Sequence, residues 1–217
     1  MLAAILMTTK FDIYKTGAPT ERGSLGYYNL LDWWDTDFSK SEKLYILEKY
    51  IPMGGGELTR GTILGSSATV INFLTGLQSW FTTLADETIS EKILKKAESL
   101  LTNETPILDT HFLYGCLIEH YYKKRNIDLR FYELAKQYCL EQIAISKKTT
   151  VAFLSDPAFP TLPRHKGYEQ LAIILEKEKE YDNALSLCLE AKEAGWNTDW
   201  DKRILTLEKK MKKNGKS

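Results

Sequence analysis

The residues with the most versatile chemistry are three histidines, His111, His120 and His165, together with Glu119, which directly precedes His120. Histidine and glutamate serve as general acids, general bases and metal ligands. A zinc-binding helix needs two histidines four positions apart, whereas His111 and His120 are nine apart and fall on opposite helix faces. We therefore expect no metal, no cofactor and no catalytic residue. If the protein has a ligand pocket, its candidate residues are Arg60, His111, Glu119, His120 and His165.

A second candidate for chemistry is the glycine run Gly54, Gly55 and Gly56. Gly56 and Gly61 have the spacing of the two glycines in a phosphate-binding P-loop. In that motif a lysine follows the second glycine and contacts the phosphate, but Thr62 occupies this position. We interpret the run as a flexible loop rather than a nucleotide site.

Residues 27–38 combine aromatic side chains with three carboxylates, Asp32, Asp35 and Asp37. One interpretation places the aromatic residues in the core and the aspartates at helix ends. The other is an acidic patch with an aromatic rim, which would suit a cationic partner. The sequence leaves both interpretations open.

Composition limits the class of protein. The chain has 217 residues, of which 43% are hydrophobic and 27% charged, as in ordinary globular proteins. Its 29 basic and 29 acidic residues balance, which argues against a nucleic-acid-binding protein. Three cysteines without paired spacing predict reduced thiols and a cytoplasmic location, and residues 1–7 lack the basic start of a signal peptide. Residues 62–85 are uncharged but too polar for a membrane span, so we predict a buried helix there and no membrane association.

Helical periodicity divides the chain into three parts. Residues 1–26 are rich in glycine and predict an extended arm or loop. Residues 27–101 form an N-terminal helical region, and residues 102–217 form a second helical region that ends in a capping helix. The clearest amphipathic or apolar helices are predicted over residues 86–101, 106–125 and 128–145.

A further helix is predicted from residue 39 by the capping box of Ser39 and Glu42. Pro52 lies just beyond this helix and should end it. Its buried side should consist of three aliphatic residues at helical spacing, Leu44, Leu47 and Ile51.

Residues 164–196 predict two short amphipathic helices joined by a tight turn. Alanines on both helices would permit a close crossing, and Gly195 falls where a helix commonly ends. This segment resembles a tetratricopeptide repeat (TPR), a helical hairpin of about 34 residues. The matching positions are Tyr168, Leu171, Ala172 and Leu175 in the first helix and Ala184, Cys188 and Ala191 in the second.

The resemblance implies an all-α fold in which helical hairpins form a right-handed stack. Residues 106–145 would supply a second, degenerate hairpin, and a last helix, capped by Thr198 and Asp201, would close the stack. Residues 147–163 lie between the hairpins and contain three prolines, so we predict an irregular loop there. Apolar residues such as Phe153 should make this loop pack back on the helices.

TPR-like hairpins present broad surfaces to extended peptides or partner helices. We therefore expect a protein–protein interaction module rather than an enzyme, with another protein or a peptide as partner and self-association as a possibility. The candidate partner-binding residues are Tyr114, Tyr121, Lys166 and Tyr168. The alternative is an enzyme or small-molecule-binding protein with a pocket between the N-terminal helices and the TPR-like part.

Overall fold

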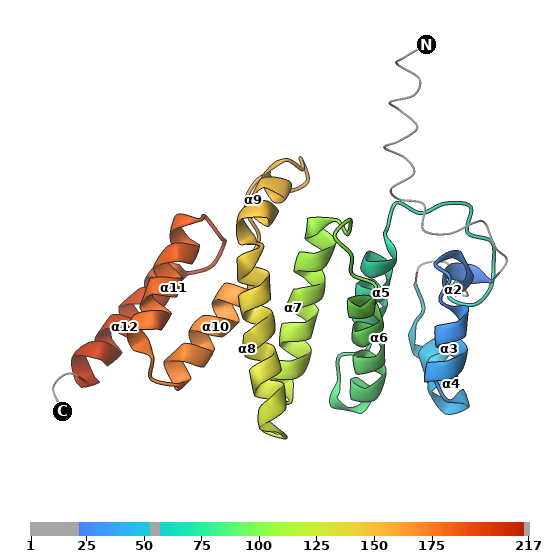
Figure 1. The fold of residues 1–217 in the computed structure, drawn as a ribbon, viewed down its shortest axis with the longest axis horizontal. Coiled ribbons are helices and arrows are strands. Elements are labelled where there is room, and N and C mark those ends of the chain that lie inside the picture. Colours follow the sequence, from blue (N-terminus) through green and yellow to red (C-terminus); the bar gives the residue numbers. More distant parts are fainter. Residues whose placement is uncertain (1–21, 53–56, 215–217) are drawn as a thin grey trace, which may run out of the picture. The chain divides into compact units, whose positions relative to one another are not determined.

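The computed structural model describes residues 22–52 and 57–214, and over these residues the protein is all-α, as predicted (Figure 1). They form eleven α-helices and one short 3-10 helix, and no strand beyond an isolated bridge between Arg22 and Gly61. None of these described helices has the length and apolar character needed to cross a membrane. The glycine triplet and most of the predicted arm lie outside the described residues. The chain divides into two compact units between Leu101 and Thr102.

The N-terminal unit begins with a helix that the sequence did not predict. Helix α2 starts at Gly23, inside the segment 1–26 that was expected to be an arm or loop. Gly23 has a φ of +60°, and the backbone amides of Ser24 and Leu25 donate to the carbonyls of Glu57 and Leu58. The backbone amides at the start of α2 therefore find their hydrogen-bond acceptors in residues 57–58, which are distant in sequence. The helices of this unit are α2 (Gly23–Tyr27), α3 (Leu31–Asp37), α4 (Lys40–Lys49), α5 (Val70–Gln78), the 3-10 helix η2 (Leu84–Asp86) and α6 (Glu87–Ser99).

Helix α4 has the predicted start but a different buried face. The capping box of Ser39 and Glu42 is present. However, Leu44, Leu47 and Ile51 are 60%, 40% and 63% exposed, so the predicted buried side was wrong. Only Ile46 of this helix is fully buried.

The inward face of α4 is largely polar. Glu42, Tyr45 and Lys49 recur at helical spacing, and each bonds a residue of η2 or α6. Asp86, at the end of η2, is the centre of this contact. Its fully buried carboxylate accepts from Lys49 Nζ at 2.7 Å, Tyr45 Oη at 2.7 Å and Thr83 Oγ1 at 2.6 Å. A prediction that looks for apolar residues at helical spacing misses such a face, because polar side chains make the contact.

The C-terminal unit is a succession of helical hairpins. Helix α7 packs on α8, α8 on α10, α10 on α11, and α11 on α12 (Figure 1). Helix α10 also contacts α7, so the α10–α11 hairpin touches both helices of the α7–α8 hairpin before it. The helices are α7 (Ile107–Lys123), α8 (Leu129–Ala144), α9 (Ser146–Leu154), α10 (Lys166–Lys177), α11 (Tyr181–Glu193) and α12 (Trp200–Asn214).

Helix α9 corrects the prediction of an irregular loop over residues 147–163. The chain stays helical from Ser146 to Leu154 because the first proline, Pro157, comes only after that helix has ended. Phe153 and Leu162 are 0% and 5% exposed, so the segment packs back on the helices as expected. Residues 155–165 contain no helix.

The contacts inside the 164–196 hairpin agree with the sequence pattern. Ala172, Ala184 and Ala191 are fully buried between helices, and Gly195 has a φ of +84° after the end of α11. The start of α12 differs from the prediction. Asp199, rather than Thr198, accepts a hydrogen bond from the backbone amide of Lys202.

A single side chain connects three helices of this unit. The Gln142 amide of α8 donates to the carbonyl oxygen of His111 in α7 at 2.7 Å, and its oxygen accepts from the amide of Gly167 in α10 at 2.6 Å. Gly167 is needed for this approach. A Cβ atom there would lie 2.9 Å from the carbonyl oxygen of Cys139 and 3.0 Å from Gln142 Oε1.

We predict that Gly167→Ala lowers the free energy of unfolding by about 1–3 kcal/mol, because the new methyl group separates α10 from α8. Gly115→Ala is the matched control within α7, where a Cβ meets only the Gln142 side chain at 3.4 Å and Lys166 Cβ at 3.9 Å. This change should be neutral or stabilising by up to about 1 kcal/mol, because alanine favours helix. Urea denaturation of both variants tests the contrast, and a shift of the same sign and size in both would contradict it.

Candidate functional site

The most exposed group of predicted site residues lies on a surface shared by α7 and α10. Lys166 Nζ of α10 is 3.6 Å from the Glu119 carboxylate of α7, and Lys123 Nζ approaches the same carboxylate at 3.1 Å. All three side chains are between 43% and 51% exposed. Burial acts in the opposite direction, but the hydrogen bond from Lys123 and the charge of Lys166 hold the pKa of Glu119 below its ordinary value.

The same surface continues to the C-terminal ends of the two helices. Lys177 Nζ of α10 donates to Tyr122 Oη of α7 at 2.9 Å and lies 5.3 Å from the centre of the tyrosine ring. The Arg125 guanidinium lies 4.3 Å from the same ring centre. Cations over an aromatic ring are held by its negative face. We call the surface formed by Glu119, Tyr122, Lys123, Lys166 and Lys177 the α7–α10 face.

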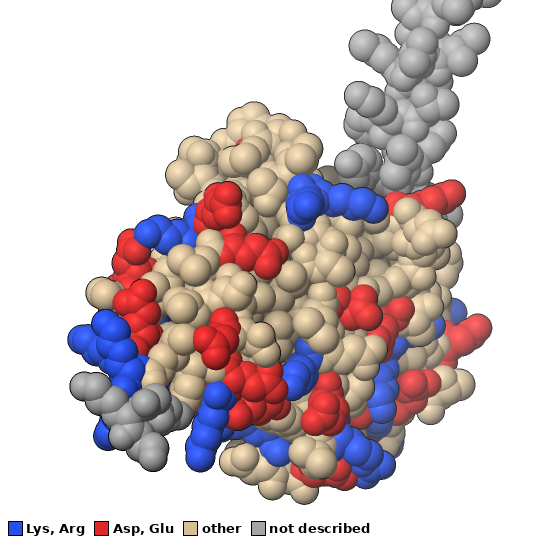
Figure 2. Space-filling model, turned by 60° about the vertical axis from the view of Figure 1, so that its left-hand side comes forward, with Lys and Arg blue, Asp and Glu red and all other residues tan. Residues whose placement is uncertain are grey.

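The α7–α10 face carries three lysines and one glutamate, and Arg125 adds a fourth cation at its end. Figure 2 shows Lys and Arg side chains lying among Asp and Glu over the surface in view. A net positive strip of this kind attracts carboxylate groups.

The other predicted partner-binding residues are not comparably exposed. Tyr121 is 4% exposed and stacks on Tyr138, with ring centres 5.7 Å apart. Tyr168 is 1% exposed, and its hydroxyl donates to Glu190 at 2.6 Å. Both are core residues, which argues against direct contact with a partner. Tyr114 is half-buried, with its ring 6.0 Å from that of Tyr138.

Two of the predicted pocket residues meet in the core of the C-terminal unit. The rings of His111, in α7, and His165, the N-cap of α10, are 4.9 Å apart. Trp196 lies against both, with ring-centre distances of 5.8 Å and 4.5 Å. The two histidines are 3% and 0% exposed. Burial lowers the pKa of His111 to about 4 and, together with the charge of His111, lowers that of His165 to about 3.

This histidine pair is poorly suited to catalysis or metal binding. His165 Nδ1 accepts from the amide of Tyr168 at 3.3 Å, so the neutral ring carries its proton on Nε2. That tautomer leaves no nitrogen of His165 free to bind a metal ion, so His111, whose Nδ1 has no hydrogen-bond partner among the described residues, could offer only a single ligand. Both rings are uncharged at neutral pH and enclosed by aromatic side chains, which makes them packing elements.

The remaining pocket candidates do not join the histidine pair. His120 is buried on α7 beside Tyr121, with ring centres 5.1 Å apart, and Glu119 is exposed on the α7–α10 face. Arg60 is an exposed residue of the N-terminal unit. Within residues 22–52 and 57–214, no group of three or more His, Cys, Asp or Glu side chains could hold a metal ion.

The cysteines are unpaired and unreactive. Cys139 and Cys188 are buried and Cys116 is half-buried, as the sequence predicted for small core residues. Burial raises the pKa of Cys116 to about 11 and that of Cys139 to about 12. Both thiols stay protonated at neutral pH, and only the thiolate is a strong nucleophile.

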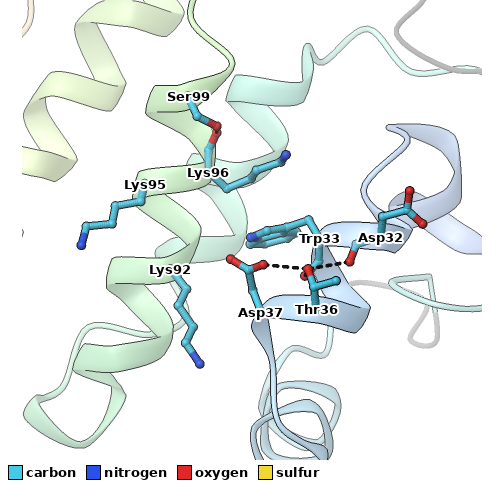
Figure 3. A pocket seen from close by; sticks show the side chains of 8 residues that line it. All are labelled: Asp32, Trp33, Thr36, Asp37, Lys92, Lys95, Lys96 and Ser99. Atoms are coloured by element: carbon cyan, nitrogen blue, oxygen red, sulfur yellow. Dashed lines mark hydrogen bonds between the residues drawn. The ribbon is translucent and has the colours of Figure 1, made fainter.

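The N-terminal unit contains a hollow of ≈470 Å³ between α3 and α6 (Figure 3). One wall carries Asp32 and Asp37, for which an acidic, aromatic-rimmed patch was one of the two interpretations of the sequence. The opposite wall carries lysines of α6, so the patch is not purely acidic. The lining residues are Asp32, Trp33, Thr36, Asp37, Lys92, Lys95, Lys96 and Ser99.

Sequence reasoning missed several of these residues. The sequence does not single out Lys123 and Lys177, because charged positions on an amphipathic helix usually form ordinary solvated surface. The one local signal was the spacing of Glu119 and Lys123, which are four apart and therefore neighbours on α7. The sequence does not single out the lysines of α6 either, since nothing in it places α3 opposite them.

Comparison with known proteins gives no further guide, because no family model, no curated protein and no solved structure matches this chain.

Proposed function

We propose that this protein is a TPR-like interaction module whose C-terminal unit binds an acidic segment of another protein along the α7–α10 face. The observation that carries the proposal is the excess of cations on that face, where Lys123 and Lys166 pair with Glu119 and Lys177 contacts Tyr122. Acidic side chains of an extended or helical partner would pair with these ammonium groups. Tyr122 would supply an aromatic contact between them.

The packing order of the helices supports the same proposal. Helix α10 contacts both α7 and α8, which brings α7 and α10 side by side and makes one surface from two hairpins. Surfaces built this way are extended and rigid, and they suit a segment longer than one helical turn. The unpaired cysteines favour a reducing compartment, so we place this activity in the cytoplasm.

Selection from a displayed library of random short peptides tests the partner chemistry. We expect the selected peptides to be rich in Asp and Glu and to bind more weakly as salt concentration rises. A library that gives no peptide above background, or gives mainly basic or apolar ones, would contradict the proposal.

Charge reversal then tests the location. The triple variant Lys123→Glu, Lys166→Glu, Lys177→Glu should bind a selected acidic peptide about 3-fold to 150-fold more weakly, since each of the three lost pairs contributes about 0.2–1 kcal/mol. The control variant Lys147→Glu, Lys148→Glu, Lys209→Glu has the same net charge but changes exposed lysines of α9 and α12. Fluorescence anisotropy measures both, and an equal loss in the two variants would show that net charge alone drives binding.

A further inference from the structure

The hollow between α3 and α6 has two walls of opposite charge (Figure 3). Asp32 and Asp37 project from α3, and Lys92, Lys95 and Lys96 from α6. Two of the lysines are already paired, because Lys92 contacts Glu42 at 2.6 Å and Lys95 contacts Glu91 at 2.7 Å.

Lys96 differs from its two neighbours. Within the part of the chain that the structure describes, its ammonium has no carboxylate within ion-pair distance. On the opposite wall, Asp37 accepts one hydrogen bond from Thr36 at 2.8 Å, and its other oxygen is available. Both Asp32 and Asp37 are exposed. The hollow therefore presents one unpaired cation and the accessible carboxylate of Asp37, whereas the Asp32 carboxylate is directed away from α6 (Figure 3).

A second observation comes from the floor of the hollow. Trp33 is 7% exposed, and its indole nitrogen is buried without a hydrogen-bond partner among the described residues. The ring is fixed by Phe38, which lies edge-on at 5.0 Å. Figure 3 shows the indole nitrogen directed toward α6, with the Lys96 side chain on one side and the Asp37 carboxylate on the other. A buried donor without an acceptor costs free energy, which a bound acceptor would recover.

We propose that this hollow binds a small zwitterion with a primary ammonium and a carboxylate, that is, a free amino acid. Lys96 and the Trp33 N–H face the carboxylate, and Asp37 faces the ammonium. A simple anion would be repelled by the aspartates and a simple cation by the lysines. The volume lies within the range of about 300–1,000 Å³ usual for small-molecule sites. Because the indole nitrogen is buried, a ligand reaches it only when a lining side chain moves, and Lys96, which Figure 3 shows beside this nitrogen, has a flexible stem that permits such a movement.

Nuclear magnetic resonance of the full chain tests this directly through the indole N–H signal of Trp33, identified by its disappearance in Trp33→Phe. We expect pools of common L-amino acids to include at least one that shifts this signal saturably at millimolar concentration. The N-acetyl derivative of that amino acid lacks the ammonium, and its amide lacks the carboxylate. Each should bind at least about tenfold more weakly, as expected when a charged contact is lost.

Two single variants test which end of the ligand each wall of the site binds. Lys96→Met should weaken binding of the amino acid but leave the weak binding of its amide nearly unchanged. Asp37→Asn should weaken binding of the amino acid but leave that of the N-acetyl derivative nearly unchanged. Lys40→Met, an exposed change on α4, is the control and should bind as the unaltered chain does. The proposal is overturned if no amino acid shifts the Trp33 signal saturably, or if the capped derivatives bind as tightly as the zwitterion.

Discussion

Replacing Asp86 by alanine should lower the free energy of unfolding of the N-terminal unit by about 2–4 kcal/mol. The fully buried carboxylate accepts hydrogen bonds from Lys49, Tyr45 and Thr83, and its removal leaves these donors without an acceptor. The loss stays below the upper end seen for buried ion pairs because the Lys49 side chain is 29% exposed and regains water. Urea denaturation followed by circular dichroism measures the change.

Asp35→Ala is the matched control for this prediction. Asp35 also pairs with a lysine, Lys43, at 2.9 Å, but its side chain is 72% exposed. An exposed pair contributes at most about 1 kcal/mol, so this variant should unfold nearly as the unaltered chain does. If Asp86→Ala costs no more than Asp35→Ala, the Asp86 contact does not hold α4 in place.

The Asp86 contact also has a defined pH dependence. Burial opposes ionisation, but hydrogen bonds from Lys49, Thr83 and Tyr45 outweigh it and hold the pKa of Asp86 well below its ordinary value. The unfolded chain therefore takes up this proton first as the pH falls. The contribution of Asp86 to stability is complete above the ordinary pKa of about 3.9 and is lost only in stronger acid.

The second large effect is a loss of stability of the C-terminal unit at acidic pH. We expect its free energy of unfolding to fall as the pH is lowered from about 6.5 to about 5, by up to about 2.7 kcal/mol per pH unit if His111 and His165 both contribute fully. In the folded chain burial lowers the pKa values of His111 and His165 to about 4 and about 3. The unfolded chain, with ordinary histidine pKa values near 6.5, binds these protons first. Stability is therefore present at neutral pH and lost toward acid.

The double variant His111→Phe, His165→Asn isolates this effect. Phenylalanine retains an aromatic ring in the cluster, and asparagine retains a side-chain acceptor at the N-cap of α10. The variant can be less stable at pH 7, but its stability should change by less than half as much between about pH 6.5 and pH 5, where most carboxylates stay ionised. Thermal unfolding at several pH values gives the slope. An unchanged slope would place the responsible protons elsewhere.

Helix existence could be predicted from the sequence wherever the local signal was strong. The apolar helix from Ile107 to Lys123 and the Asp128-capped helix after it were both found, because length and caps are local properties. The prediction over residues 147–163 failed for a local reason too. Prolines late in a segment were allowed to exclude helix before them, although Pro157 constrains only its own neighbourhood.

The side of a helix that faces the core could be predicted only where the residues on that side are apolar. Leu171 and Ala172 are buried as expected, since a stripe of apolar residues marks the side of the helix that packs in the core. For α4 the stripe pointed the wrong way, because Tyr45 and Lys49 make the inward contact through polar groups. Whether a polar residue faces a buried carboxylate depends on another helix, and one sequence does not contain that information.

The candidate site was the least predictable part. Lys166 was named from the sequence and lies on the exposed α7–α10 face, whereas Tyr121 and Tyr168 were chosen for their polar handles and are core residues. A tyrosine hydroxyl finds partners equally well inside and outside a helical stack. Neither the approach of Lys177 to Tyr122 nor that of His111 to His165 could be predicted, since each depends on how two hairpins pack.

The Gln142 amide fixes how α10 is aligned with the preceding hairpin. It bonds the backbone of α7 at His111 and the backbone of α10 at Gly167, so a slide of α10 by one residue would break a buried bond and drive a side chain into α8. The alignment is thus set at a point of contact and not by the length of chain between the helices. Residues 155–161, which lie in that connection, can therefore gain or lose a residue while the two hairpins keep the same relation.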